Sequence, residues 1–496
     1  MPKSVQTKMA HGALWMVLFK FVERTLGLIS TLILVRLLDP AQFGIVAMAL
    51  SFIVMAELLA AFGFDIALIQ RQDATPEHYH TAWTLNVLMG LVISVLMLAV
   101  AAPISTFYNQ PDLFWVVCIL AAGPLISGAE NIGVVAFRKD FQFHKEFLFQ
   151  LSRKAIGFVV VIPLAFWLQN YWALVAGMLA SKLSGTIFSY LAHPFRPHFT
   201  LSKAANLVGF SKWLLMNNMV SFLKERSSDF FIGRLHGPAV LGLYNVSYEF
   251  ANLPTTELSA PINRALLPGF AKLKSDAEAL VAGYLNAIRL LALLAVPAAA
   301  GVFAVAHYFV PVVLGAKWLG ATPLLELLAL NGVLLLFHSS ICSVLIATGH
   351  PDRVTKTNGI YVVILLVALF LLTGRGAEGA AYAVLTASVL STPIYLLHVR
   401  YCIGVGARAF LYSIIRPVLG SLLMIVVVRW MLPAYSPSQT MAESVLLLVG
   451  GIAVGLVTYL VVIFIMWQVL SRPNGAEQLV LTKISETIKA RFRPTI

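Results

Sequence analysis

This 496-residue sequence contains few charged side chains. Asp, Glu, Lys and Arg make up 11% of the chain, against about 25% in a typical soluble domain. The mean hydropathy is +0.85. Apolar segments of about 20 residues, the length that crosses a bilayer, follow one another with few breaks. We therefore expect an all-α polytopic membrane protein with about 14 transmembrane helices.

Cysteine is also scarce, and the three that are present lie in or beside apolar segments: Cys118, Cys342 and Cys402. Their odd number and wide spacing predict no disulfide framework and no metal site. We expect no cofactor either. A Walker A pattern is absent, which argues against an ATP-driven pump. Energy for any transport would come from an ion gradient, the membrane potential or removal of the product.

Lys and Arg gather in alternate loops of the expected topology. With the N-terminus inside, the outer loops hold only Lys317 and Arg375, and Arg36, Arg234 and Arg429 lie at helix ends. This asymmetry predicts that both termini are cytoplasmic and that the number of spans is even. The basic inner loops attract anionic membrane lipids. No soluble domain carries a basic patch, so nucleic-acid binding is not expected.

A short internal repeat divides the chain. "RLLDPAQFGIV" begins at Arg36 and "RLHGPAVLGLY" begins at Arg234, with five identities at a constant offset of 198 residues. Six spans separate the two copies, so both halves would have the same orientation, as in parallel-repeat transporters. Local turn chemistry alone also produces Pro and Gly at such helix starts.

The repeat suggests a division into five parts. We expect a first six-helix lobe over 1–192, a cytoplasmic linker over 193–209 and a second six-helix lobe over 210–402. Two extra helices would occupy 403–470. A cytoplasmic amphipathic tail would occupy 471–496, although a frayed, solvated tail is an equally good interpretation.

Two apolar segments contain clusters of charge, one around Lys20 and one around Lys224. Such groups are costly at the bilayer centre and normally face a wet cavity or an ionic partner. The candidates for lining a cavity are Lys20, Arg24, Lys224, Arg226, Arg264 and Arg289. The acids that would bind a coupling cation or form ion pairs are Glu23, Glu57, Asp65, Asp229 and Glu257. Since acids and bases within the spans are nearly equal in number, ion pairing between helices is an open alternative. For Arg153 and Lys154, snorkelling to the cytoplasmic surface is the favoured interpretation.

The stretch "GALWMVLFKFVERTLGLISTLILVRLLDPAQFGIVAMALSFI" resembles the polysaccharide-exporter (PST, Wzx-type) branch of the multidrug/oligosaccharidyl-lipid/polysaccharide (MOP) superfamily. "VLGAKWLGATPLLELLALNGVL" and "GRGAEGAAYAVLTASV" are similar to the second lobe of that branch. The resemblance implies two six-helix lobes around a central cavity, plus two C-terminal helices. It also implies that undecaprenyl-pyrophosphate-linked glycans, of the exopolysaccharide or lipopolysaccharide (O-antigen) type, move from the inner to the outer leaflet of the bacterial inner membrane. Polysaccharide polymerase or export machinery would be a partner. The branch supplies no invariant site motif.

The charges suit such a substrate, because basic side chains compensate the desolvation of a pyrophosphate. Two other functions stay open. A multidrug or cation antiporter of the same superfamily would favour an acidic cavity and twelve spans. A membrane enzyme such as a glycan polymerase would need a large outer loop, and every outer loop expected here is short.

Overall fold

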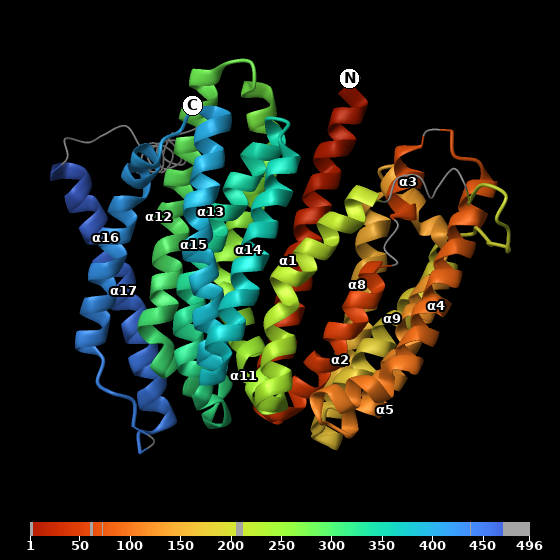
Figure 1. Cartoon of the computed structure of the whole chain (residues 1–496), viewed down its shortest axis with the longest axis horizontal. Helices are drawn as coiled ribbons and strands as arrows, with labels where there is room; N and C mark the ends of the chain where they lie inside the picture. Colours follow the sequence, from red (N-terminus) through yellow and green to blue (C-terminus); the bar gives the residue numbers. More distant parts are fainter. Residues whose placement is uncertain (1–2, 60–62, 72, 205–211, 437, 470–496) are drawn as a thin grey trace, which may run out of the picture. The chain divides into compact units, whose positions relative to one another are not determined.

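The computed structural model describes residues 3–59, 63–71, 73–204, 212–436 and 438–469. Within these residues every regular element is a helix (Figure 1). The elements before the linker are α1 (Lys3–Leu37), α2 (Pro40–Leu59), α3 (Phe64–Gln70), α4 (Pro76–Tyr108), α5 (Asp112–Leu120), α6 (Ala122–Gly128), η1 (Ile132–Val134), α7 (Val135–Lys139), α8 (Phe143–Leu168) and α9 (Trp172–Ala192).

The elements after the linker begin with a long helix. They are α11 (Lys212–Leu273), α12 (Ala277–Phe309), η2 (Val310–Leu314), η3 (Ala316–Ala321), α13 (Thr322–Ala347), α14 (Pro351–Leu372), η4 (Thr373–Arg375), α15 (Ala377–Ile403), α16 (Ala407–Met431) and α17 (Met441–Val469).

Ten helical segments of the described residues are long and apolar enough to cross a membrane. A bent pair, Asp112–Gly128 and Ile132–Lys139, meets at 61° and adds an eleventh if it counts as one span. The charge clusters lie in α1 and α11, which are 35 and 62 residues long. Because Gly237 has a φ of 77°, α11 consists of two helices. Together with α1 and the two halves of α11, these ten or eleven apolar segments form the polytopic all-α fold that the sequence predicts.

The chain divides into two compact units, residues 1–242 and 243–496. In the second unit, buried side chains of α12, α13 and α15 form a core that includes Tyr284, Ile288, Ile341 and Tyr395. Each of these helices contributes buried apolar side chains to this core. The expected lobe boundaries at residues 192, 210 and 402 stay predictions.

The two C-terminal helices belong to the second unit and pack against α12. Figure 1 shows α16 and α17 side by side with α12. The Tyr459 hydroxyl of α17 donates to the Leu293 carbonyl of α12 at 2.8 Å. The Tyr308 hydroxyl of α12 donates to the Pro433 carbonyl after α16 at 2.9 Å. These helices are therefore bound to α12 through hydrogen bonds as well as apolar contacts.

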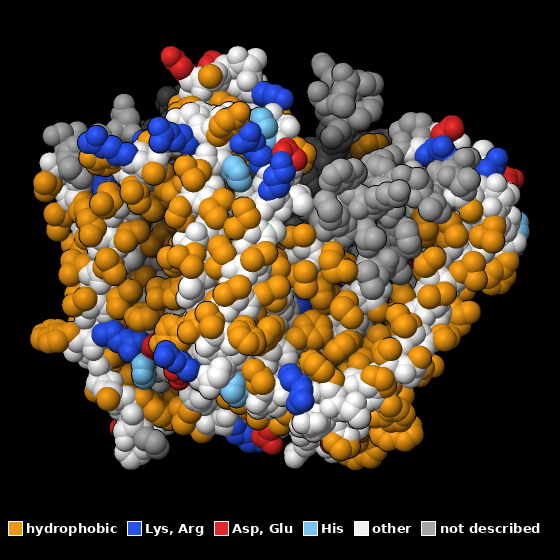
Figure 2. Space-filling model, in the orientation of Figure 1, with side chains coloured by type: hydrophobic (Ala, Val, Ile, Leu, Met, Phe, Trp, Pro, Cys, Tyr) orange, Lys and Arg blue, Asp and Glu red, His pale blue; other side chains and the backbone are white. Residues whose placement is uncertain are grey.

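The surface of the second unit suits a bilayer. In the face that Figure 2 shows, apolar side chains cover a broad middle band, and Lys and Arg gather toward its two edges. Large apolar side chains such as Phe370, Trp430 and Leu446 are exposed. An exposed apolar surface of this extent marks contact with lipid or another apolar partner.

The first part of the expected linker is bound to the first unit. Residues 193–200 lack regular structure, yet their backbone is held by side chains. The Asn131 amide nitrogen donates to the Phe195 carbonyl at 2.7 Å, and the Thr84 hydroxyl accepts from the Thr200 N–H at 3.0 Å. Nδ1 of His80 accepts from the His198 N–H at 3.1 Å. Residues 205–209 and the expected tail, 471–496, lie outside the described residues.

Candidate functional site

The charge cluster of α1 extends to a second helix. Glu23 accepts a hydrogen bond from Lys20 at 2.7 Å through one carboxylate oxygen, and Lys154 of α8 lies 3.3 Å from the other oxygen. Lys154, for which the sequence favoured snorkelling to the cytoplasmic surface, thus has a carboxylate partner on a neighbouring helix. Arg24 follows on the same helix and is half-buried. Two ammonium groups therefore share one carboxylate between α1 and α8.

The second charge cluster, in α11, is organised around a buried carboxylate. Asp229 is 1% exposed. Its Oδ2 accepts from Arg226 at 3.1 Å and from the Ser51 hydroxyl of α2 at 3.3 Å. The Arg226 side chain itself is 35% exposed. Asp229 therefore holds the guanidinium of an arginine that is about one third exposed. Lys224 is half-buried, and Glu225 is exposed.

Other acids of the first unit have basic partners on neighbouring helices. Glu57 of α2 pairs with Lys182 of α9 at 2.7 Å. Glu130 pairs with Arg153 at 3.1 Å. These pairs favour the interpretation of inter-helix ion pairing over a coupling-cation site for Glu57. Asp65 lies in α3, near the charges of Arg138 and Glu146.

The predicted site residues of the second unit are less closely grouped. Arg289 of α12 is half-buried and donates to the Asn286 side-chain oxygen at 3.0 Å. Both side chains line a pocket of about 690 Å³ at the start of α12, which Ile403 and Gly404 also line. Glu257 is exposed on α11. The side chain of Arg264 lies outside the described part of the structure.

A further polar cluster ties α16 to α12 and α13. The Arg429 guanidinium donates to the Glu326 carboxylate and, at 2.9 Å, to the Phe303 carbonyl. Nδ1 of His307 lies 3.0 Å from both Arg429 and the same carboxylate oxygen. The Arg429 guanidinium also lies over the Phe303 ring, 5.2 Å from its centroid. Sequence spacing did not reveal this cluster, because its residues come from three separate helices.

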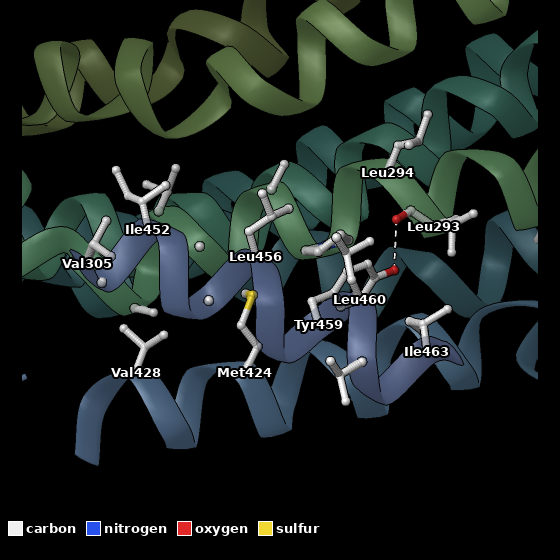
Figure 3. A pocket seen from close by; sticks show the side chains of 18 of the residues that line it. Leu293, Leu294, Val305, Met424, Val428, Ile452, Leu456, Tyr459, Leu460 and Ile463 are labelled. Carbon is white, nitrogen blue, oxygen red and sulfur yellow. Dashed lines mark hydrogen bonds between the residues drawn. The ribbon is translucent and has the colours of Figure 1, made fainter. Parts of the chain in front are cut away.

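An apolar pocket of about 920 Å³ lies where α12, α16 and α17 meet. Figure 3 shows Leu456 and Leu460 of α17, Met424 of α16 and Leu293 of α12 around it. Gly301, Gly451 and Gly455 widen it because they carry no side chain. Its lining is almost entirely apolar, so it suits a hydrocarbon chain.

The residues that the structure describes contain no group of three or more His, Cys, Asp or Glu side chains that could hold a metal ion. Cys118, Cys342 and Cys402 are all free thiols.

A family model described as polysaccharide biosynthesis protein matches residues 33–323, which is more than half of the chain. The chain belongs to this family. The lipopolysaccharide biosynthesis protein WzxC of Escherichia coli is 28% identical over 431 residues, 86% of this chain and 87% of WzxC. The succinoglycan biosynthesis transport protein ExoT of Rhizobium meliloti is 25% identical over 466 residues, 91% of this chain and 92% of ExoT.

The family member also shares its fold with a solved transporter. The lipid II flippase MurJ, in an inward closed conformation, aligns with a TM-score of 0.76 and 14% identity. The alignment covers 93% of this chain and 100% of MurJ. The sequence matches confirm the resemblance to polysaccharide-exporter (PST, Wzx-type) proteins, and the structural match shows that the chain has the fold of MurJ. The chain is a multi-pass protein of the bacterial inner membrane.

Proposed function

We propose that this family member moves undecaprenyl-pyrophosphate-linked oligosaccharide repeat units from the cytoplasmic to the periplasmic leaflet. The repeat units are of the exopolysaccharide or O-antigen type. The family match over residues 33–323 carries the proposal, and the likeness to WzxC over most of both chains supports it. The polar head of such a lipid cannot cross hydrocarbon unaided. A polysaccharide polymerase that uses the units outside is the partner we expect.

The mechanism we propose is alternating access. Two six-helix lobes, 1–192 and 210–402, expose a shared polar cavity to one leaflet and then to the other. Both termini are cytoplasmic in this topology, as the distribution of Lys and Arg predicts. The lipid tail stays in the bilayer throughout, so only the charged head needs a protein path.

Basic side chains within the helices supply the path for the pyrophosphate. We assign Lys20, Arg24, Lys224 and Arg226 to it, with Arg289 and Arg264 as further members in the second lobe. The geometry supports Arg226 best: Asp229 holds its guanidinium at 3.1 Å while a third of the side chain is exposed. A guanidinium held in this way keeps free N–H groups for phosphate oxygens.

Deletion of the gene in its native host tests the proposal. We expect surface polysaccharide to be lost while lipid-linked repeat units accumulate in the inner leaflet, and a plasmid copy should restore export. Normal surface polysaccharide in the deletion strain, with no accumulated precursor, would refute the proposal.

The antiporter alternative makes a different prediction. Vesicles that contain the purified protein would show exchange of a drug for H⁺ or Na⁺ without any lipid-linked substrate. The polysaccharide relatives give that alternative less support than the flippase.

A further inference from the structure

The Lys20–Glu23–Lys154 cluster has a surplus of positive charge. Each carboxylate oxygen of Glu23 faces one ammonium, at 2.7 Å from Lys20 and 3.3 Å from Lys154. The three side chains together carry a net charge of +1. Of the ion pairs described in the first unit, Glu57–Lys182 and Glu130–Arg153 contain one cation for each carboxylate. The cluster on α1 and α8 therefore differs from a simple structural pair.

Exposure separates the cations from the anion. The Lys20 and Lys154 side chains are 51% and 54% exposed, whereas Glu23 is 23% exposed. By contrast, the side chain of Lys182 in its one-to-one pair is 26% exposed. About half of each lysine side chain is thus exposed, and Glu23 between them is less exposed.

The cluster lies far from the helix ends. Lys20 is 17 residues from each end of α1 (Lys3–Leu37), which corresponds to about 25 Å of helix in either direction. Lys154 is likewise near the middle of α8 (Phe143–Leu168). A lysine within an apolar helix is costly unless a partner or ligand compensates its charge. A polar ligand at this position would offset part of that cost.

We propose that Lys20, Glu23 and Lys154 form a diphosphate-binding triad. Glu23 holds the two lysines close together in the empty protein, and the lysines bind the diphosphate of the substrate when it enters. This inference rests on the proposed flippase function and adds Lys154 and Glu23 to its binding residues. Each ammonium has three N–H donors and uses one on Glu23. The others donate to phosphate oxygens, and adjacent phosphates of a diphosphate engage both lysines at once.

The role of Glu23 is to limit affinity. In the empty protein its charge offsets the repulsion between the two ammonium groups. In the bound state it competes with the diphosphate for them, and this competition favours release. Loss of Glu23 should tighten binding and slow turnover, whereas loss of either lysine should weaken binding.

The test measures binding of undecaprenyl pyrophosphate to the purified full-length protein in lipid nanodiscs. We expect Lys20→Gln and Lys154→Gln to weaken binding about tenfold each, the equivalent of one charge-assisted hydrogen bond. Glu23→Gln should tighten binding severalfold and lower the rate of flipping. Lys356→Gln, on an exposed lysine of α14, is the matched control and should change neither quantity. Inorganic pyrophosphate as a competitor distinguishes a site for the free diphosphate from one that needs the lipid.

A variant that folds poorly could lose binding for that reason alone. Amine labelling of the wild-type protein avoids this problem, because it uses no variant. Undecaprenyl pyrophosphate should protect Lys20 and Lys154 from an amine-reactive reagent and leave Lys356 reactive. Unchanged affinity in Lys154→Gln, or equal labelling with and without the lipid, would overturn the triad while leaving the flippase intact. If the wild-type protein binds no undecaprenyl pyrophosphate at all, the proposed function itself fails.

Discussion

Gly44 packs directly against the backbone of Pro238, and Gly242 packs in the same way against Pro40. These four residues occupy matching positions in the two copies of the sequence repeat, so the contact is reciprocal. A Cβ atom at either glycine would overlap the carbonyl oxygen of the opposing proline. The repeated Pro and Gly therefore serve close backbone packing in addition to local turn chemistry.

Gly44→Val should destabilise the folded protein. The added side chain meets backbone atoms, which cannot move aside as a side chain can, and overpacking of this kind costs about 1–3 kcal/mol or more. Thermal unfolding followed by fluorescence-detected gel filtration would show a lower midpoint. Gly27→Ala is the control, because a Cβ at Gly27 meets nothing within 4 Å. An equal midpoint for Gly44→Val and the wild type would contradict the packing.

Asp229→Asn should lower stability because it leaves Arg226 without its carboxylate. Removal of one partner of a fully buried pair costs about 3–5 kcal/mol. We expect about 1–3 kcal/mol here, because the Arg226 side chain is 35% exposed and solvent screens its charge. Thermal unfolding of both single variants and the double variant Arg226→Gln/Asp229→Asn gives the coupling. If the loss of stability in the double variant equals the sum of the losses in the two single variants, Arg226 and Asp229 do not stabilise each other.

Arg429→Gln should loosen α16 from α12 and α13. The substitution removes the bonds to Glu326 and the Phe303 carbonyl and leaves a carboxylate without its cation. Hydrogen exchange is expected to speed up in residues 426–436. Arg408→Gln, at the start of α16, is the control, since Arg408 contacts only the Tyr412 ring among the described interactions. Unaltered exchange in Arg429→Gln would show that apolar packing alone holds these helices.

Acid should release the backbone segment that follows α9. The pKa of His193 is lowered by burial and by the charges of Lys145 and Arg196, and its Nδ1 accepts from the Phe195 N–H at 3.2 Å. The folded protein thus favours the neutral imidazole. The stabilisation is fully present above the unfolded pKa of about 6.5 and declines as the pH falls below that value. Limited proteolysis after residue 193 should increase from pH 7.5 to 5.5, and His193→Gln should reduce the pH dependence.

The membrane potential should assist flipping. An anionic head that leaves a negative interior gains about 2.3 kcal/mol per charge for each 100 mV. Collapse of the potential with valinomycin and K⁺ should therefore slow flipping in proteoliposomes, and the same K⁺ without valinomycin serves as the control. An unchanged rate after collapse would exclude the potential as the energy source.

Much of the fold is predictable from composition alone. Spans of about 20 apolar residues form helices in lipid because backbone groups have no other partner there. The charge clusters in α1 and α11 were visible as exceptions to that pattern. The contacts Lys20–Glu23 and Arg226–Asp229 could also be predicted, because residues three apart share a helix face.

Only the tertiary structure decided which charges meet across helices. Lys182 and Glu57 are separated by 125 residues, and Arg429 and Glu326 by 103. Nothing in the sequence relates such positions, because their contact depends on which helices pack together and at what depth. For the same reason the sequence by itself determined that charges lie within the spans, whereas the packing of α8 on α1 decided that Lys154 joins Lys20 at Glu23.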